Sequence, residues 1–136
     1  MTTLDDNIRY LPRLSMSGAM RLFGMTARAI RFYEKQGLIE ARRDRRNARY
    51  FDASARVRLE RIGQLRAGGV ALQDIAQVLD EADRGGAFRD LALKTLDTRR
   101  AQVRQELEAV EAAIAAIDGA APAPAERPAA GRVAAV

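Results

Sequence analysis

The sequence predicts a mainly α-helical protein that carries one small arginine-rich hairpin. Short apolar stretches of helical length, separated by glycines, fill residues 15–82. Among them, turn-forming residues within the arginine-dense segment Arg42–Arg49 predict a hairpin. Residues 87–118 instead repeat apolar side chains every seven positions, which predicts one long helix with a partner. We expect residues 1–14 to form a flexible arm and the Ala/Pro-rich residues 119–136 a disordered tail.

The composition excludes several classes of function. The chain has no cysteine and no histidine, so it cannot form disulfides, thiolate zinc sites or imidazole acid–base pairs. No catalytic constellation is visible, and we therefore expect no enzyme activity, no cofactor and no metal site. The first fifteen residues do not resemble a signal peptide, and there is no run of about 18 apolar residues. We expect the protein to be cytoplasmic and to have no membrane partner.

The basic charge is concentrated in the first part of the chain. Residues 1–80 carry 15 basic and 9 acidic side chains, whereas residues 81–136 carry 8 and 9. All basic residues except Lys35 and Lys94 are arginines. Arginine binds phosphate and guanine through two parallel hydrogen bonds, which favours a nucleic-acid partner. A GC-rich genome also raises arginine content, but it does not explain the clustering.

The first two helices are short and joined by a glycine turn. Ser17 is expected to cap a helix over Gly18–Phe23. Gly24 then begins a tight turn, and Thr26 caps a second helix over Ala27–Gln36. Two helices connected in this way are typical of a helix-turn-helix.

The second helix separates apolar from basic positions. Arg28 and Arg31 point away from the first helix, and Gly37 ends the second helix. The positions expected to face the first helix are Ala29, Ile30 and Tyr33. Arg28, near the start of the helix, is the best candidate to contact a base edge, and Arg31 is suited to a phosphate.

The segment after this helix predicts a two-stranded hairpin. Leu38–Ile39 begins an extended segment, Arg49–Phe51 ends one, and the turn formers Asp44 and Asn47 lie between them. The arginines near the tip are Arg42, Arg43, Arg45 and Arg46. Alone, such a cluster is often only a solvated loop. Directly after a helix-turn-helix, it predicts a wing that binds DNA phosphates with a strong dependence on salt.

Two further helices complete the first part of the chain. Asp52 or Ser54 caps a third helix, which Gly68-Gly69 ends. Its apolar stripe consists of Ala55, Leu59, Ile62 and Leu65. A fourth helix is expected over Leu72–Leu79.

The long helix, from Phe88 to about Ile117, carries an apolar seam. Its a and d positions are Leu93, Leu96, Arg100, Val103, Leu107, Val110, Ile114 and Ile117. A lone helix cannot bury this seam, so we expect a dimer. Arg100 is the single charged residue at an a position, where it either snorkels out or fixes the register.

These features together resemble the MerR family of bacterial transcription regulators. The segment TARAIRFYEKQGLI, beginning at Thr26, is similar to the recognition helix of that family. The resemblance covers about residues 15–118, through wing arginines at Arg43 and Arg49 and the two helices that follow to the long helix.

The resemblance implies a winged helix-turn-helix domain over residues 15–82. Residues 87–118 would form an antiparallel coiled coil in a homodimer. Such regulators bind inverted-repeat promoter operators in double-stranded DNA and distort them so that RNA polymerase can engage. The residues expected to contact DNA are Thr26, Arg28, Arg31, Tyr33, Arg42, Arg43, Arg45, Arg46, Arg49 and Tyr50.

The chain departs from the family pattern in three respects. Ala48 stands where many members have a tyrosine before the wing arginine. The absence of cysteine excludes the metal and redox sensing that other members perform through cysteines. No C-terminal effector domain is expected either. The alternatives are an architectural or recombination-directing DNA-binding protein, or a coiled-coil adaptor whose basic face is incidental.

Overall fold

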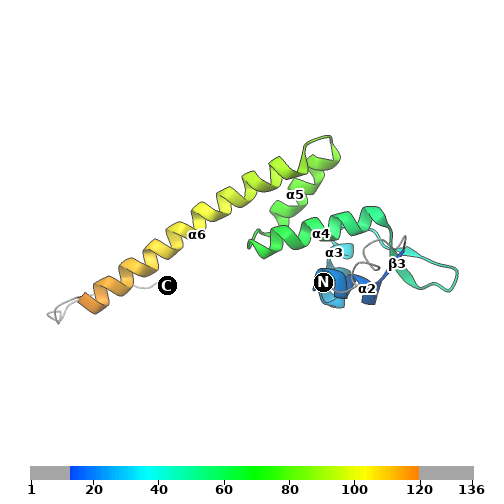
Figure 1. The fold of residues 1–136 in the computed structure, drawn as a ribbon, viewed down its shortest axis with the longest axis horizontal. Helices are drawn as coiled ribbons and strands as arrows, with labels where there is room; N and C mark the ends of the chain where they lie inside the picture. The colour runs from blue at the N-terminus through cyan, green and yellow to red at the C-terminus, as the bar shows by residue number, and fades with distance from the viewer. Residues whose placement is uncertain (1–12, 120–136) are drawn as a thin grey trace. The chain divides into compact units, whose positions relative to one another are not determined.

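The computed structural model describes residues 13–119. The predicted arm up to residue 12 and the predicted tail from residue 120 lie outside the described residues. The described part contains helices and a small sheet (Figure 1). In chain order these are β1 (Leu14–Ser15), α2 (Met16–Phe23), α3 (Ala27–Lys35), β2 (Arg42–Arg43), β3 (Arg49–Phe51), α4 (Ala53–Ala67), α5 (Leu72–Asp83) and α6 (Phe88–Gly119). Residues up to Arg99 belong to one compact unit, and the remainder of α6 belongs to a second.

The helix-turn-helix forms as predicted, with one correction at its start. The Ser15 hydroxyl, and not that of Ser17, caps α2 by accepting a hydrogen bond from the Gly18 amide at 3.0 Å. Gly24 ends α2 in the left-handed conformation, with φ 63°, which glycine adopts without steric cost. The Thr26 hydroxyl caps α3 by accepting a hydrogen bond from the Ala29 amide at 3.0 Å.

The predicted hairpin forms between β2 and β3, and a third strand, β1, extends it into a three-stranded sheet. The strand order is β1-β3-β2, and both pairings are antiparallel. Leu14, predicted to belong to the flexible arm, pairs with Phe51 in β3 and has 1% of its surface exposed. This pairing fixes Leu14 immediately before α2, which explains why the helix begins earlier than predicted.

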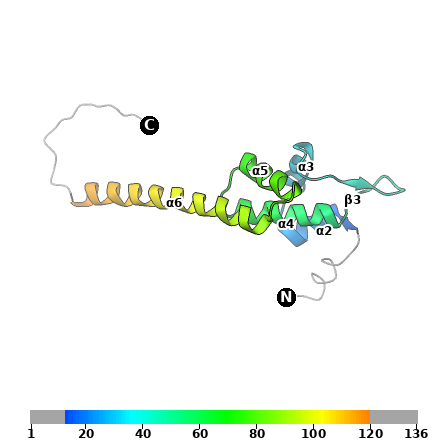
Figure 2. The ribbon, with the colours of Figure 1, turned by 90° about the horizontal axis from the view of Figure 1, so that it is seen from above.

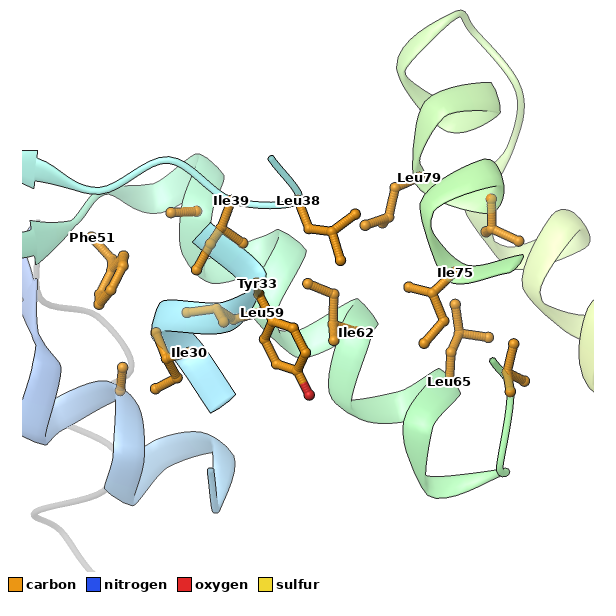
Figure 3. Packing of buried hydrophobic residues seen from close by; sticks show 14 of the residues in the cluster. Ile30, Tyr33, Leu38, Ile39, Phe51, Leu59, Ile62, Leu65, Ile75 and Leu79 are labelled. Carbon is orange, nitrogen blue, oxygen red and sulfur yellow. The ribbon is translucent and has the colours of Figure 1, made fainter. Parts of the chain in front are cut away.

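One hydrophobic core joins the helices to the sheet (Figure 3). Ile30 from α3, Phe51 from β3, and Leu59 and Ile62 from α4 are each fully buried. Figure 3 shows Ile75 and Leu79 of α5 reaching the same core from the side opposite Phe51. Each such side chain contributes about 1.5–3 kcal/mol relative to remaining exposed. The predicted stripe of the third helix is confirmed, since all its members are buried.

Arg58 connects the segment before the wing to the far end of α5. Its Nε atom donates a hydrogen bond to the Leu38 carbonyl, and its Nη1 atom lies 2.8 Å from the Asp83 carboxylate. The Asp83 contact belongs to a part of α5 beyond the predicted end of the helix at Leu79. Arg58 therefore restrains the connection that leads from α3 into the wing.

The first part of α6 packs against the end of α4. Arg99 donates from Nε to the Gly68 carbonyl at 3.4 Å. A Cβ atom on Gly68 would lie 2.5 Å from Leu96 Cδ2, so a larger residue there would require the Leu96 side chain to move. Leu96, predicted to lie in the seam, is partly buried against the core of its own unit.

The described part of the second unit, up to Gly119, is a helical segment whose side chains are all exposed. Along it, from Arg100 to Gly119, the exposed fractions of the apolar seam residues range from 41% for Val103 to 82% for Ile117. A helix of this kind is marginal in water without a partner for its apolar stripe. None of the described helices is long and apolar enough to cross a membrane.

Candidate nucleic-acid interface

One face of α3 is basic and exposed. Arg28, Arg31, Phe32 and Lys35 are spaced by three and four residues, which places them on the same side of the helix. The opposite side carries the buried Ile30. The face opposite the core is therefore open to a partner and carries three cations around one aromatic ring.

The α3 face borders a hollow of about 700 Å³. Its far wall is formed by Arg66, from the last turn of α4, and Leu72, from the start of α5. Arg66 was not among the predicted contacts, because it is distant in sequence from α3 and outside the arginine cluster. It places a further exposed cation beside Arg28 and Arg31.

The two adjacent aromatic residues of α3 have different environments. Tyr33, a predicted DNA contact, is 8% exposed and packs in the core. Phe32 is 47% exposed and was not predicted as a contact. Their rings lie edge to face, with centroids 6.3 Å apart. Tyr33 therefore supports α3 from within, whereas Phe32 is the aromatic ring presented outward.

The tip of the wing is organised by Asp44. Its carboxylate accepts hydrogen bonds from the backbone amides of Arg46, at 2.8 Å, and Ala48, at 2.9 Å. Asn47 adopts φ 65°, a left-handed conformation that asparagine tolerates. The side chains of Arg45 and Arg46 are exposed at this turn, where the hairpin extends away from the helices (Figure 2). Ala48 is also exposed, which leaves the expected tyrosine position without an aromatic ring.

The remaining arginines of the cluster have partners within the protein. Arg42 Nε donates to the Asp52 carboxylate at 2.8 Å. This hydrogen bond raises the pKa of Arg42, while the Ala55 amide and then Arg42 lower the pKa of Asp52. Arg43 donates from Nη1 to the Asn47 carbonyl at 2.8 Å.

Arg49 and Tyr50 also make contacts within the first unit. Arg49 Nε lies 3.3 Å from Glu34 Oε1 at the end of α3. The guanidinium of Arg13 lies 4.6 Å from the centre of the half-buried Tyr50 ring, a cation–π contact. Arg13, which we had predicted to belong to the flexible arm, thus adds a cation beside the wing.

The structure brings most of the predicted contacts onto one unit but gives them different roles. Arg28 and Arg31 on α3 and Arg45 and Arg46 at the wing tip are exposed. Thr26 caps a helix. Among the described residues, no cluster of three or more His, Cys, Asp or Glu side chains is arranged to hold a metal ion.

A helix-turn-helix followed by a basic wing defines the class of winged helix-turn-helix DNA-binding proteins. Residues 14–82, half of the chain, match the family of MerR HTH family regulatory proteins. The chain belongs to this family of transcription regulators, as the resemblance implied. None of the curated proteins matches the chain.

Solved structures of helix-turn-helix transcription regulators share the fold. HiNmlR, a family member lacking the sensor domain and bound to promoter DNA, is 21% identical, with a TM-score of 0.56 over 75% of this chain and 78% of that one. A regulator from Bacillus cereus is 18% identical, with a TM-score of 0.63 over 79% and 78%. SkgA from Caulobacter crescentus is 26% identical, with a TM-score of 0.53 over 81% of each chain.

Proposed function

We propose that the chain is a transcription regulator that binds an inverted-repeat promoter operator as a homodimer and distorts it. The observation that carries the proposal is the exposed basic face of α3, with Arg28 and Arg31, in the same unit as a wing tip bearing Arg45 and Arg46. The structure of HiNmlR on promoter DNA supports the choice of ligand. RNA polymerase at the same promoter is the further partner in this proposal.

The two basic elements have different tasks. Arg28 begins the exposed face of α3 and is the residue that we propose reads a base edge in the major groove. Arg31 and Arg66 lie on either side of the hollow beside α3 and are suited to phosphates. At the wing, Arg43, Arg45 and Arg46 are exposed and suited to the backbone. Base contacts would set the sequence, and phosphate contacts would set the register and most of the affinity.

The exposed seam of α6 supports dimerisation. Leu107, Val110 and Ile114 are each more than half exposed in the chain, although they are large and apolar. A second copy of the helix is a partner with the same seven-residue period. We therefore keep residues 15–82 as the DNA-binding domain and residues 87–118 as the dimerisation helix. The first part of α6, up to Arg99, nevertheless belongs to the same compact unit as the DNA-binding domain.

The charges on α6 favour an antiparallel dimer. In a parallel dimer, Arg100 would face its own copy in the seam, Arg99 would lie near the partner's Arg104, and Glu106 near the partner's Glu111. Each contact would bring like charges together, and the first would bury them.

The antiparallel arrangement removes these conflicts at the centre of the seam. It places Arg100 opposite the partner's Val110 and Val103 opposite the partner's Leu107. Arg104 then lies near the partner's Glu111, an attractive pair. The like-charge contacts that remain, Glu106 with the partner's Glu106 and Asp97 with the partner's Asp118, lie at the solvent-exposed edges of the coil and not within the seam. Two heads at the opposite ends of such a coil would bind two half-sites in inverted orientation.

The proposal is tested by selecting duplexes from a random-sequence pool with the full-length chain. We expect an inverted repeat, one protected half-site per protomer, and a DNA bend detected by circular-permutation gel mobility. Enriched duplexes without symmetric half-sites, bound by a dimer, would instead indicate an architectural protein. No enrichment above the starting pool would overturn DNA recognition and leave the coiled-coil adaptor.

The sequence supports a further part of the proposal, which concerns the input signal. Since the chain contains no cysteine, thiolate chemistry cannot sense a metal or an oxidant in this protein. Operator binding should therefore be unchanged by thiol oxidants and by added zinc or copper. An oxidant- or metal-dependent change in affinity would contradict this part of the proposal alone.

A further inference from the structure

Arg49 differs from the other arginines of the wing. The side chains of Arg49 and Glu34 are 25% and 29% exposed, so most of each is covered. Arg42, Arg43, Arg45 and Arg46 are exposed by comparison. Arg49 therefore occupies the base of the wing, at its contact with α3, and its charge is largely withdrawn from the surface that would face DNA.

The strand geometry explains why Arg49 points toward α3. Side chains two residues apart on a strand leave the sheet on the same side, so Arg49 shares a face with Phe51. Phe51 is fully buried in the core that α3 also lines. The same face therefore directs Arg49 toward Glu34, near the end of α3, with 3.3 Å between Nε and Oε1.

The contact between Arg49 and Glu34 is an ion pair and not an aligned hydrogen bond. The Arg49 Nε atom is buried and makes no hydrogen bond within the described part of the chain, although the Glu34 oxygen is close. A buried N–H without an aligned acceptor is costly, so the charge attraction must hold this side chain in place. Glu34 is the acidic residue that provides this attraction.

We propose that Arg49 is a positioning residue and not a DNA contact. Its pair with Glu34 holds the wing against the recognition helix, so that the tip arginines and Arg28 engage one duplex together. This inference rests on the proposed binding of double-stranded DNA. In this proposal the base of the wing sets the orientation of the wing relative to α3, and the arginines at the tip bind phosphates. The pair then contributes to affinity by preorganising two separate parts of the footprint.

Replacing Glu34 with glutamine distinguishes positioning from direct contact. If the pair positions the wing, Glu34→Gln should weaken binding about three- to tenfold, because the wing loses its fixed orientation. If Arg49 instead binds phosphate and Glu34 competes for it, Glu34→Gln should tighten binding. The probe is a duplex enriched by the wild-type chain from the random pool, titrated at several salt concentrations. Tighter or unchanged binding by Glu34→Gln would overturn the proposal.

The salt dependence of an Arg49 variant provides a second test. Arg49→Gln should weaken binding while leaving the slope of log affinity against log salt unchanged. Loss of a phosphate contact would instead reduce that slope by about 0.9. Arg45→Ala, at the tip, is the matched control and should show that reduction. A reduced slope for Arg49→Gln would refute the positioning role even if both variants bind weakly.

A third measurement separates positioning from a general loss of stability. In a background carrying Arg45→Ala and Arg46→Ala, the wing has fewer cations to present, so Glu34→Gln should lose most of its effect. A purely structural defect would cost the same affinity in both backgrounds and would overturn the proposal. Arg49→Lys retains the positive charge beside Glu34 and should recover most of the affinity that Arg49→Gln loses. If the wild-type chain itself enriches no duplex, the proposed function fails before this inference is tested.

Discussion

Val103→Glu is the most direct test of the proposed dimer. Val103 lies at a d position near the middle of the α6 seam and is 41% exposed in the single chain. In the antiparallel arrangement it opposes the partner's Leu107, and symmetry places the substitution in the interface twice. The variant would therefore put two carboxylates into the apolar centre of one coil.

The size of the effect follows from burial and desolvation. Losing the buried valine costs about 1 kcal/mol, and placing a carboxylate in an apolar contact costs at least about 2 kcal/mol more. With two copies per dimer, the loss is about 6 kcal/mol, which corresponds to roughly a 10⁴-fold weaker dimer. A dimer with a nanomolar dissociation constant would become mostly monomeric at low micromolar protein.

The assay is sedimentation velocity of the full-length chain across a concentration series. Gln105→Glu is the control, because it adds the same charge to the same turn of α6 at an outward heptad position. The wild-type chain and Gln105→Glu should sediment as dimers, and Val103→Glu as a monomer. A dimeric Val103→Glu, or a monomeric wild-type chain, would refute the proposed seam. Equal dissociation of both variants would show a general charge effect instead.

Three further predictions test the DNA-binding unit. Replacing Arg45 and Arg46 together with alanine should lower the slope of log affinity against log salt by about 2. Arg42→Ala should change that slope less, because Arg42 already pairs with Asp52. Equal slope changes for both variants would contradict the assignment of phosphate binding to the tip arginines. Arg28→Ala should cost about 1–3 kcal/mol at one symmetric operator position, measured by competition with base-substituted duplexes, and a uniform loss on all sequences would make it a phosphate contact. Asp52→Ala removes a helix cap and should lower the free energy of unfolding by about 1 kcal/mol at neutral pH. Because the folded-state pKa of Asp52 is lowered, its contribution is present above the unfolded pKa, about 3.9, and is lost as the pH falls through the folded-state pKa. Urea unfolding curves of wild type and Asp52→Ala should therefore begin to converge only below about pH 4 and meet below the folded-state pKa.

Local sequence signals were sufficient for the helix-turn-helix. Thr26, Gly24 and Gly37 were predictable because each acts within a few residues of its own position. The strand at Leu14 was not predictable, since a two-residue strand has no periodicity and exists only through its pairing with Phe51. The start of α2 followed from the same distant pairing, which is why Ser17 was the wrong cap.

The candidate site shows the same limit of local reasoning. Arg28 and Arg31 were correctly predicted to be exposed because helical periodicity fixes their side of α3. The contribution of Arg66 depends on α4 folding back beside α3, which no local pattern indicates. Tyr33 and Phe32 are adjacent aromatic residues, and only the packing of the whole unit decides which one is buried.

The arginine cluster is best understood through its acidic neighbours. Asp52 holds Arg42 and caps α4, Asp44 closes the turn through backbone amides, and Glu34 pairs with Arg49. Each carboxylate therefore fixes part of the wing, and none of these contacts is made to the side chains of Arg45 or Arg46. A solvated, self-repelling loop would have no need of such fixed contacts at its base and its turn. The placement of these acids orders the wing while leaving its tip positive, and this is the distribution of charge that binding to DNA phosphates requires.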